Sequence, residues 1–313
     1  NKLCYLKPLL PSSYSPIFQG NFASMAEQGA ADSRVPLPPS IFLDGCAWGC
    51  SIYVGAQSVF EKMWGPDFGT HTIMQGDSAG ALVGIAWSLG LPADFLEEVY
   101  SDLAMCGPVE MVKLRLSDYH DAAIDRIFQK FPDAHERIRG RCHIGITVFP
   151  RKHIWATEWM DLAHLRNCLH CSMHIPLYCR EVPFWEGQAV VDGGIAIGGK
   201  HLAHGDRTLV LSAAPWSSWP GERMFDLAIP LPIIQTMLPP SGDLGAQRMF
   251  ELGASLVREW FENGGHMSPR KRRSALFRVG GSAVCAGMWT LRALEQYALP
   301  SRVRRPPIQR SRL

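Results

Sequence analysis

The chain has 313 residues, of which 47% are hydrophobic and 19% charged, and its formal net charge is +2. This composition excludes intrinsic disorder of most of the chain, because a disordered protein carries less apolar and more charged material. The longest uninterrupted apolar stretch, residues 79–87, has about half the ~18 residues of a membrane-spanning helix. We therefore expect a globular protein with a large core.

Charge and cysteine content indicate the surroundings of the protein. Eleven Lys and Arg residues lie between 270 and 313 against the single acid Glu295, so the C-terminal region is strongly basic and the rest mildly acidic. Such a basic segment predicts contact with an anionic surface. The nine cysteines are irregularly spaced and no basic-then-apolar leader opens the sequence, which favours reduced thiols in the cytoplasm.

Taken in chain order, the sequence predicts an irregular arm followed by alternating strands and helices. Residues 1–40 contain six prolines and no periodicity. Short apolar runs bounded by turn residues indicate strands, and longer periodic runs indicate helices. We expect strands at 40–43, 72–75, 143–148, 189–191 and 209–212, helices at 50–64, 81–89 and 160–174, and a helical region at 94–139 that is broken at Pro108 and Pro132.

This alternation predicts a fold of the α/β class, with a mostly parallel central sheet covered by helices on both faces. We expect three regions: an irregular Pro-rich N-terminal arm at 1–40, the sheet domain at 41–235, and a helical, basic C-terminal extension at 236–313.

A G-x-S-x-G motif at residues 76–80 lies between a predicted strand and a predicted buried helix. In nucleophile elbows the serine sits on a strained turn that exposes its hydroxyl, and small flanking residues let strand and helix pass closely. The helix N-terminus also favours developing negative charge. Ser78 is therefore the candidate nucleophile.

Two further elements surround this motif in the sequence. The small-residue stretch Gly45-Cys46-Ala47 connects a predicted strand to a predicted helix, and successive backbone N–H groups in such a loop can form an oxyanion hole. Asp192 ends a later strand and is followed by two glycines. A carboxylate held beside a serine can act as its base without a histidine.

The order and spacing of the three elements resemble the patatin-like phospholipase family. Its pattern is D-G-G-G-x-R/K-G, then G-x-S-x-G, then D-G-G/A, and the resemblance covers residues 41–197. It is similar to the animal-type branch that contains adiponutrin and adipose triglyceride lipase. The matching segments are 45–46, 53–55, 76–81, 144–147, 171–172 and 175–178.

The resemblance implies a three-layer α/β/α fold and a catalytic Ser–Asp dyad. Ser78 would be the nucleophile, Asp192 the base, and the backbone N–H groups of Gly45, Cys46 and Ala47 the oxyanion hole. The loop departs from the family pattern at three places. Ala47 replaces a glycine, Gly49 a frequent Arg or Lys, and Cys50 the last glycine. The usual Asn-Pro after the Asp-Gly-Gly turn is also missing.

These features together predict a serine lipid acyl hydrolase, of phospholipase or triacylglycerol lipase type, that works through an acyl-enzyme. It would act in the cytoplasm at an anionic membrane or lipid-droplet surface, in lipid metabolism and lipid degradation. No cofactor, metal or nucleic acid is expected, and nothing in the sequence indicates an oligomeric state. The altered loop leaves open a catalytically weak lipid- or membrane-binding protein of the same fold. Transfer of the acyl group to another lipid is a further alternative.

Two other arrangements fit parts of the sequence. Asp206 and His266 could complete a Ser–Asp–His triad in an α/β-hydrolase, although the His-Gly-Gly-Gly loop of that class is missing and the Asp-Gly-Gly turn would have no role. A zinc site is suggested by the spacing of His164, Cys168, Cys171 and His174. One continuous helix cannot readily direct four ligands at a tetrahedral ion.

Overall fold

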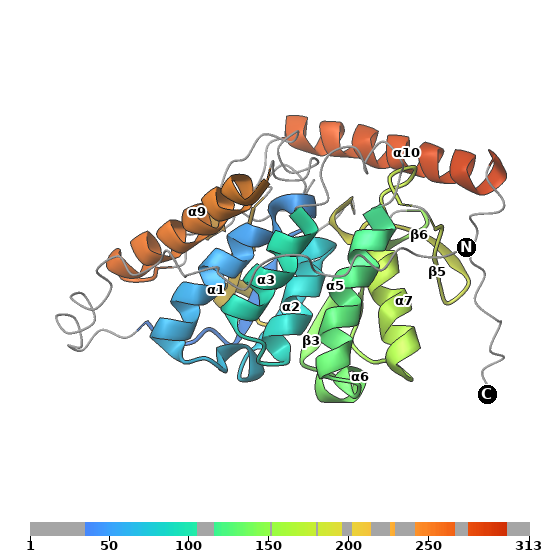
Figure 1. Ribbon diagram of the computed structural model, residues 1–313. Coiled ribbons are helices and arrows are strands. Elements are labelled where there is room, and N and C mark those ends of the chain that lie inside the picture. Colours follow the sequence, from blue (N-terminus) through green and yellow to red (C-terminus); the bar gives the residue numbers. More distant parts are fainter. Residues whose placement is uncertain are drawn as a thin grey trace. The chain divides into compact units, whose positions relative to one another are not determined.

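The computed structural model describes residues 35–104, 116–150, 152–179, 181–195, 202–213, 226–228, 242–266 and 275–298 (Figure 1). Most of the predicted N-terminal arm, both clusters of basic residues in the C-terminal region and the predicted boundary near residue 235 lie outside these ranges. The three-region division therefore stays a prediction.

The sheet has the strand order β5-β6-β3-β2-β1-β7-β8. The eighth strand, β4, pairs with β3 and stands outside this order. The neighbours β3, β2, β1, β7 and β8 are parallel, whereas β4 and β6 run antiparallel to β3. The strands are β1 Ser40–Leu43, β2 Ile73–Asp77, β3 Cys142–Val148, β4 Lys152–Ala156, β5 Phe184–Trp185, β6 Gln188–Val191, β7 Thr208–Ser212 and β8 Leu227–Ala228.

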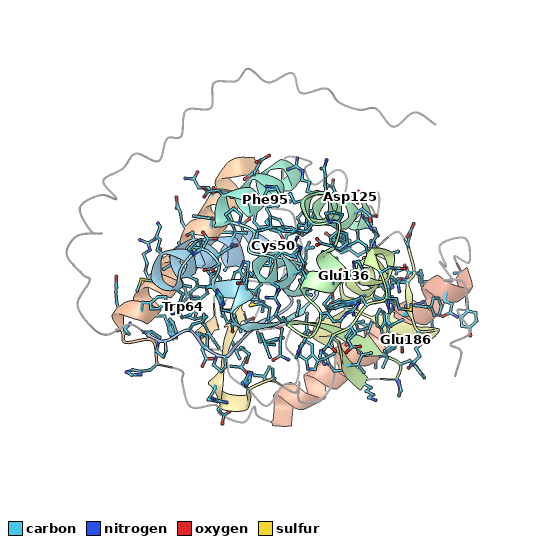
Figure 2. The ribbon with its side chains drawn as sticks, turned by 90° about the horizontal axis from the view of Figure 1, so that it is seen from below. Cys50, Trp64, Phe95, Asp125, Glu136 and Glu186 are labelled. Carbon is cyan, nitrogen blue, oxygen red and sulfur yellow. The ribbon has the colours of Figure 1, made fainter. Side chains whose placement is uncertain are left out.

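Helices lie on both sides of this sheet (Figure 2). They are α1 Cys50–Trp64, α2 Ala79–Ser88, α3 Ala93–Ala104, α5 Leu116–Lys130, α6 Ala134–Arg137, α7 Leu162–Ser172, α9 Gly242–Glu262 and α10 Ala275–Ala298. The predicted α/β fold with a mostly parallel central sheet is thereby confirmed. None of the helices within the described ranges combines the length and apolarity that crossing a bilayer requires.

The main core forms where α1, α2 and α7 meet the sheet. Helix α2 is buried on every side, as its apolar sequence predicts, and contacts β1, β2 and β3. Helix α9 lies along α1 (Figure 1). The two backbones meet at glycines, because a Cβ on Gly55 would clash with the carbonyl oxygen of Phe250, and one on Gly253 with that of Ile52. Close packing of α9 therefore depends on both glycines.

The parallel register brings the ends of β1, β2 and β3 to one edge of the sheet. Leu43 pairs with Gly76, and Asp77 pairs with Gly145. The loops that follow β1 and β2 consequently open on the same side, which is where parallel α/β sheets place their binding sites.

Candidate active site

Ser78 forms the single-residue connection between β2 and α2. Its backbone has φ 54° and ψ −132°, a conformation that non-glycine residues rarely adopt. The flanking glycines make the turn possible: a Cβ on Gly76 would lie 2.6 Å from the oxygen of Gly80, and one on Gly80 would lie 2.6 Å from the oxygen of Asp44. The structure thus has the strained strand–turn–helix geometry expected from the G-x-S-x-G motif.

The end of α7 fixes this turn from below. The backbone N–H of Ser78 donates to Ser172 Oγ at 2.9 Å, and that hydroxyl donates to the carbonyl oxygen of Gly145 at 2.7 Å. All three groups are buried. One hydroxyl therefore ties the elbow to the neighbouring strand β3.

The loop at residues 44–50, here called the Gly45 loop, approaches both other candidate residues. A Cβ built on Gly45 would lie 3.2 Å from Ser78 Cβ and 3.8 Å from Asp192 Oδ1. Only a residue without a side chain leaves the space between them open. The structure thus brings together the three elements that the sequence places about 30 and 115 residues apart.

Ala47 has a left-handed backbone conformation, with φ 46°. Left-handed backbone costs an L-residue roughly 1–2 kcal/mol, so neighbouring groups must hold the turn. The N–H of Gly49 donates to the oxygen of Cys46 at 2.7 Å, and Cys50 Sγ donates to the oxygen of Ala47 at 3.2 Å. The substituted cysteine supplies one of these contacts.

The base of the Gly45 loop is anchored by buried polar groups. Asp44 is buried and its Oδ2 accepts from Ser212 Oγ at 2.9 Å, while its carbonyl oxygen accepts from the Tyr53 hydroxyl at 2.7 Å. That hydroxyl also accepts from the N–H of Ala213 at 3.2 Å. Burial raises the pKa of Tyr53 well above its usual range, so the phenol stays a neutral donor.

Asp192 follows β6 directly and is buried. Because β6 runs antiparallel to β3 and ends opposite Thr147, its terminal turn lies over Gly145, beside the elbow. The N–H of Asp192 donates to the oxygen of His174 at 2.8 Å, and Asp192 Oδ1 accepts from the N–H of Gly194 at 2.8 Å. The carboxylate is therefore oriented by its own turn.

Helix α10 holds this turn through two buried charged residues that sequence analysis did not single out. Glu295 accepts from His174 Nε2 at 3.2 Å and from the N–H of Leu177 at 3.2 Å. Arg292 Nε donates to the oxygen of Val190 at 3.1 Å, two residues before Asp192. Burial lowers the pKa of His174, so its ring is neutral and donates to Glu295. No local pattern marks these contacts.

A second unpredicted pair lies under the site. Asp77 Oδ1 and His153 Nε2 are 2.9 Å apart, and both side chains are buried. The ring of His153 packs edge-on against Trp155, with centroids 4.5 Å apart. A Cβ on Gly193 would lie 3.1 Å from Asp77 Oδ1, so the pair supports the turn that carries Asp192.

The structure does not assemble the alternative triad. Asp206 precedes β7, whose first residue pairs with Ser40 at the start of β1, so it lies at the sheet edge opposite the elbow. His266 follows α9, and its neighbour Gly265 packs against Val35, which precedes β1. Both candidates therefore lie away from the end of the sheet that carries Ser78.

The four residues of the suggested zinc site also have separate surroundings. The His164 ring stacks on Trp185 with centroids 4.7 Å apart, and His174 pairs with Glu295. Cys168 and Cys171 are buried in the core, where burial raises the pKa of each thiol. Within the described ranges, no group of three or more His, Cys, Asp or Glu side chains is arranged to hold a metal ion.

Two curated proteins match part of the chain. No family model matches the chain. The human patatin-like phospholipase domain-containing protein 5 is 26% identical over 148 residues, and its mouse counterpart is 27% identical over 152 residues. Both alignments cover 45% of this chain and 33% of the relative. The resemblance to patatin-like phospholipases is confirmed.

The chain spans about a third of the length of these patatin-like relatives. Among solved structures, the crystal structure of the type III effector protein ExoU matches 84% of this chain and 63% of its own, with 12% identity and a TM-score of 0.37.

Proposed function

We propose that the protein is a serine lipid acyl hydrolase that cleaves fatty-acyl esters through a Ser–Asp dyad. The observation that carries this proposal is the approach of Gly45 to both Ser78 and Asp192 at a positive-φ elbow. The similarity to patatin-like phospholipases supports a lipid as the substrate. The lipid would be a phospholipid or a neutral glyceride at a membrane or lipid-droplet surface.

In the proposed mechanism Ser78 Oγ attacks the ester carbonyl while Asp192 accepts the hydroxyl proton. The backbone N–H groups of Gly45, Cys46 and Ala47 stabilise the oxyanion, and each such donor contributes roughly 3–4 kcal/mol to the transition state. The tetrahedral intermediate expels the alcohol, which takes the proton back from Asp192. Water, deprotonated by the same carboxylate, then releases the fatty acid and restores the serine.

The conformation of Ala47 favours catalysis over the catalytically weak, lipid-binding alternative. An alanine at position 47, where the family pattern has glycine, would weaken an oxyanion hole if the loop could not reach positive φ, which alanine disfavours. Ala47 nevertheless adopts φ 46°, and the contacts from Gly49 and Cys50 support that turn. The alanine therefore does not force the loop out of the left-handed conformation at this position, which supports the catalytic alternative.

The test is fatty-acid release from vesicles of phosphatidylcholine and triacylglycerol by wild type, Ser78→Ala and Asp192→Asn. Matched controls are Ser58→Ala on α1 and Asp133→Asn before α6, whose hydrogen bonds are local. We expect both dyad variants to fall to background and both controls to keep wild-type rates. Activity that survives in Ser78→Ala, or a silent wild type, would reject the proposal. Product analysis with an added acceptor alcohol separates hydrolysis from acyl transfer.

A further inference from the structure

On the second half of α10 the charged side chains are buried and large apolar side chains are exposed. Over residues 286–298 the only charged side chains are Arg292 and Glu295, and their exposed fractions are 1% and 0%. On the same turns, Leu294 is 54% exposed and Tyr297 is 82% exposed. A surface helix of a water-exposed protein has the opposite arrangement.

The buried contacts of α10 prevent the helix from rotating to hide its apolar residues. Arg292 donates to the carbonyl oxygens of Val190 and Pro183, both at 3.1 Å. Glu295 accepts from His174 and from the N–H of Leu177. Rotation would break these bonds and leave buried polar groups unsatisfied, which costs about 1–3 kcal/mol for each group. Leu294 and Tyr297 are therefore held outward.

A neighbouring turn extends the apolar surface. Phe149, directly after β3, is 62% exposed, and its ring packs edge-on against Trp289 of α10 with centroids 5.1 Å apart. The end of β3 lies at the sheet edge where β2 leads into Ser78. Phe149 and Trp289 thus lie near the edge that carries the candidate active site, and together with Leu294 and Tyr297 of the same helix we call them the α10 outer surface.

The flanking sequence specifies what this surface contacts. Four consecutive basic residues stand at 270–273, before α10, and five arginines with no acid follow it at 299–313. Apolar and aromatic residues between basic segments are complementary to an anionic lipid surface, where each Lys or Arg contributes about 1 kcal/mol. A second copy of the chain would bring basic segments against basic segments.

We propose that α10 docks on anionic phospholipid bilayers, with the α10 outer surface in the apolar part of the interface. The site belongs to the same molecule that we propose as a lipid hydrolase, and docking places the active-site edge toward its substrate. The lipid contact itself does not require hydrolysis, so the two proposals can fail separately.

The test is flotation with vesicles of phosphatidylcholine and phosphatidylserine at about 70:30, a ratio that makes the surface anionic. All proteins carry Ser78→Ala, so that the lipid is not consumed. We compare Leu294→Gln/Tyr297→Gln with Met160→Gln, which replaces an apolar residue that is 64% exposed before α7. The double variant should reduce the partition coefficient by at least about tenfold, since two apolar side chains no longer enter the lipid. The Met160 variant should change it by less than about twofold.

Equal loss in both variants, unchanged binding by the double variant, or absence of wild-type binding would overturn the proposal. A lipid-independent dimer, seen by light scattering and abolished by Leu294→Gln/Tyr297→Gln, would overturn it in favour of self-association. Unfolding midpoints within a few degrees of each other show that all proteins are folded. Loss of hydrolysis in the parent protein has no effect on this result.

Discussion

Replacement of Ala47 tests whether the Gly45 loop is an oxyanion hole. Ala47 has φ 46°, which costs an L-residue roughly 1–2 kcal/mol. Glycine removes this cost but gives back about 0.4–1 kcal/mol through the greater freedom of the unfolded chain. Ala47→Gly is therefore expected to raise the free energy of unfolding by about 0 to 1.6 kcal/mol. Because alanine already adopts the required conformation, kcat should stay near the wild-type value.

Ala47→Val makes the opposite change at the same position. A β-branched side chain at positive φ is a strong outlier, so the loop is expected to shift and its N–H groups to move away from the oxyanion. Loss of one such donor lowers kcat by about 10²–10³. The assay combines initial rates of fatty-acid release with urea unfolding, so that kcat and stability are measured on the same preparations.

Glu186 provides the matched control, since it has φ 48° in the exposed turn between β5 and β6 (Figure 2). Glu186→Gly and Glu186→Val should change stability in the same directions as the Ala47 variants and leave kcat unchanged. If Ala47→Val lost stability but kept its kcat, the loop would not hold the oxyanion. If Ala47→Gly increased kcat about tenfold, alanine would be distorting the donors instead of reproducing the glycine conformation.

Three further predictions concern the support of the site. Ser172→Ala should leave the buried N–H of Ser78 unsatisfied and reduce the free energy of unfolding by about 1–3 kcal/mol. We expect kcat to fall by a larger factor than KM changes; unchanged kinetics would contradict a role of Ser172 in positioning Ser78. Glu295→Ala should reduce the free energy of unfolding by a similar amount and lower kcat, whereas Glu262→Ala at the exposed end of α9 should do neither. Equal losses in the two variants would show that the contacts of Glu295 do not support the candidate site. Burial and the neighbouring His170 lower the pKa of His120 from 6.5 to about 3. Between pH 6.5 and about 3 the unfolded chain therefore binds a proton that the folded chain does not. As the pH is lowered through this range, the free energy of unfolding decreases by at most about 1.4 kcal/mol per pH unit. His120→Asn should flatten this slope in urea unfolding, and an unchanged slope would exclude His120 as its cause.

The sequence was sufficient for the elements that contain their own signals. The strand at 40–43 and the helix at 50–64 have the predicted bounds because a short apolar run ends at a turn in one case and at Gly65-Pro66 in the other. The elbow was predictable because steric demands at Gly76 and Gly80 allow few other residues. Local backbone requirements of this kind are recorded directly in the residue types.

The unpredicted features depend on contacts between distant residues. β4 was missed because it is a short strand with mostly half-exposed side chains, so its hydrophobic pattern is weak. Asp77 and His153 are separated by 76 positions, and His174 and Glu295 by 121. The buried contacts of Arg292 and Glu295 were missed because nothing next to either residue in the sequence indicates that it is buried.

The buried contacts of α10 also set an order in which the candidate site can be completed during synthesis. The elbow and its Ser172 contact use residues up to 172, and the anchors of the Gly45 loop use residues up to 213, so all of these contacts can form before α10 has been made. The partners of His174 and Val190 come only with residues 292–295. Because folding during synthesis proceeds from the N-terminus, a nascent chain would have the candidate nucleophile Ser78 in place before the candidate base Asp192 is fixed. In the proposed mechanism, acyl transfer would therefore begin only after α10 has packed against the turn that carries Asp192.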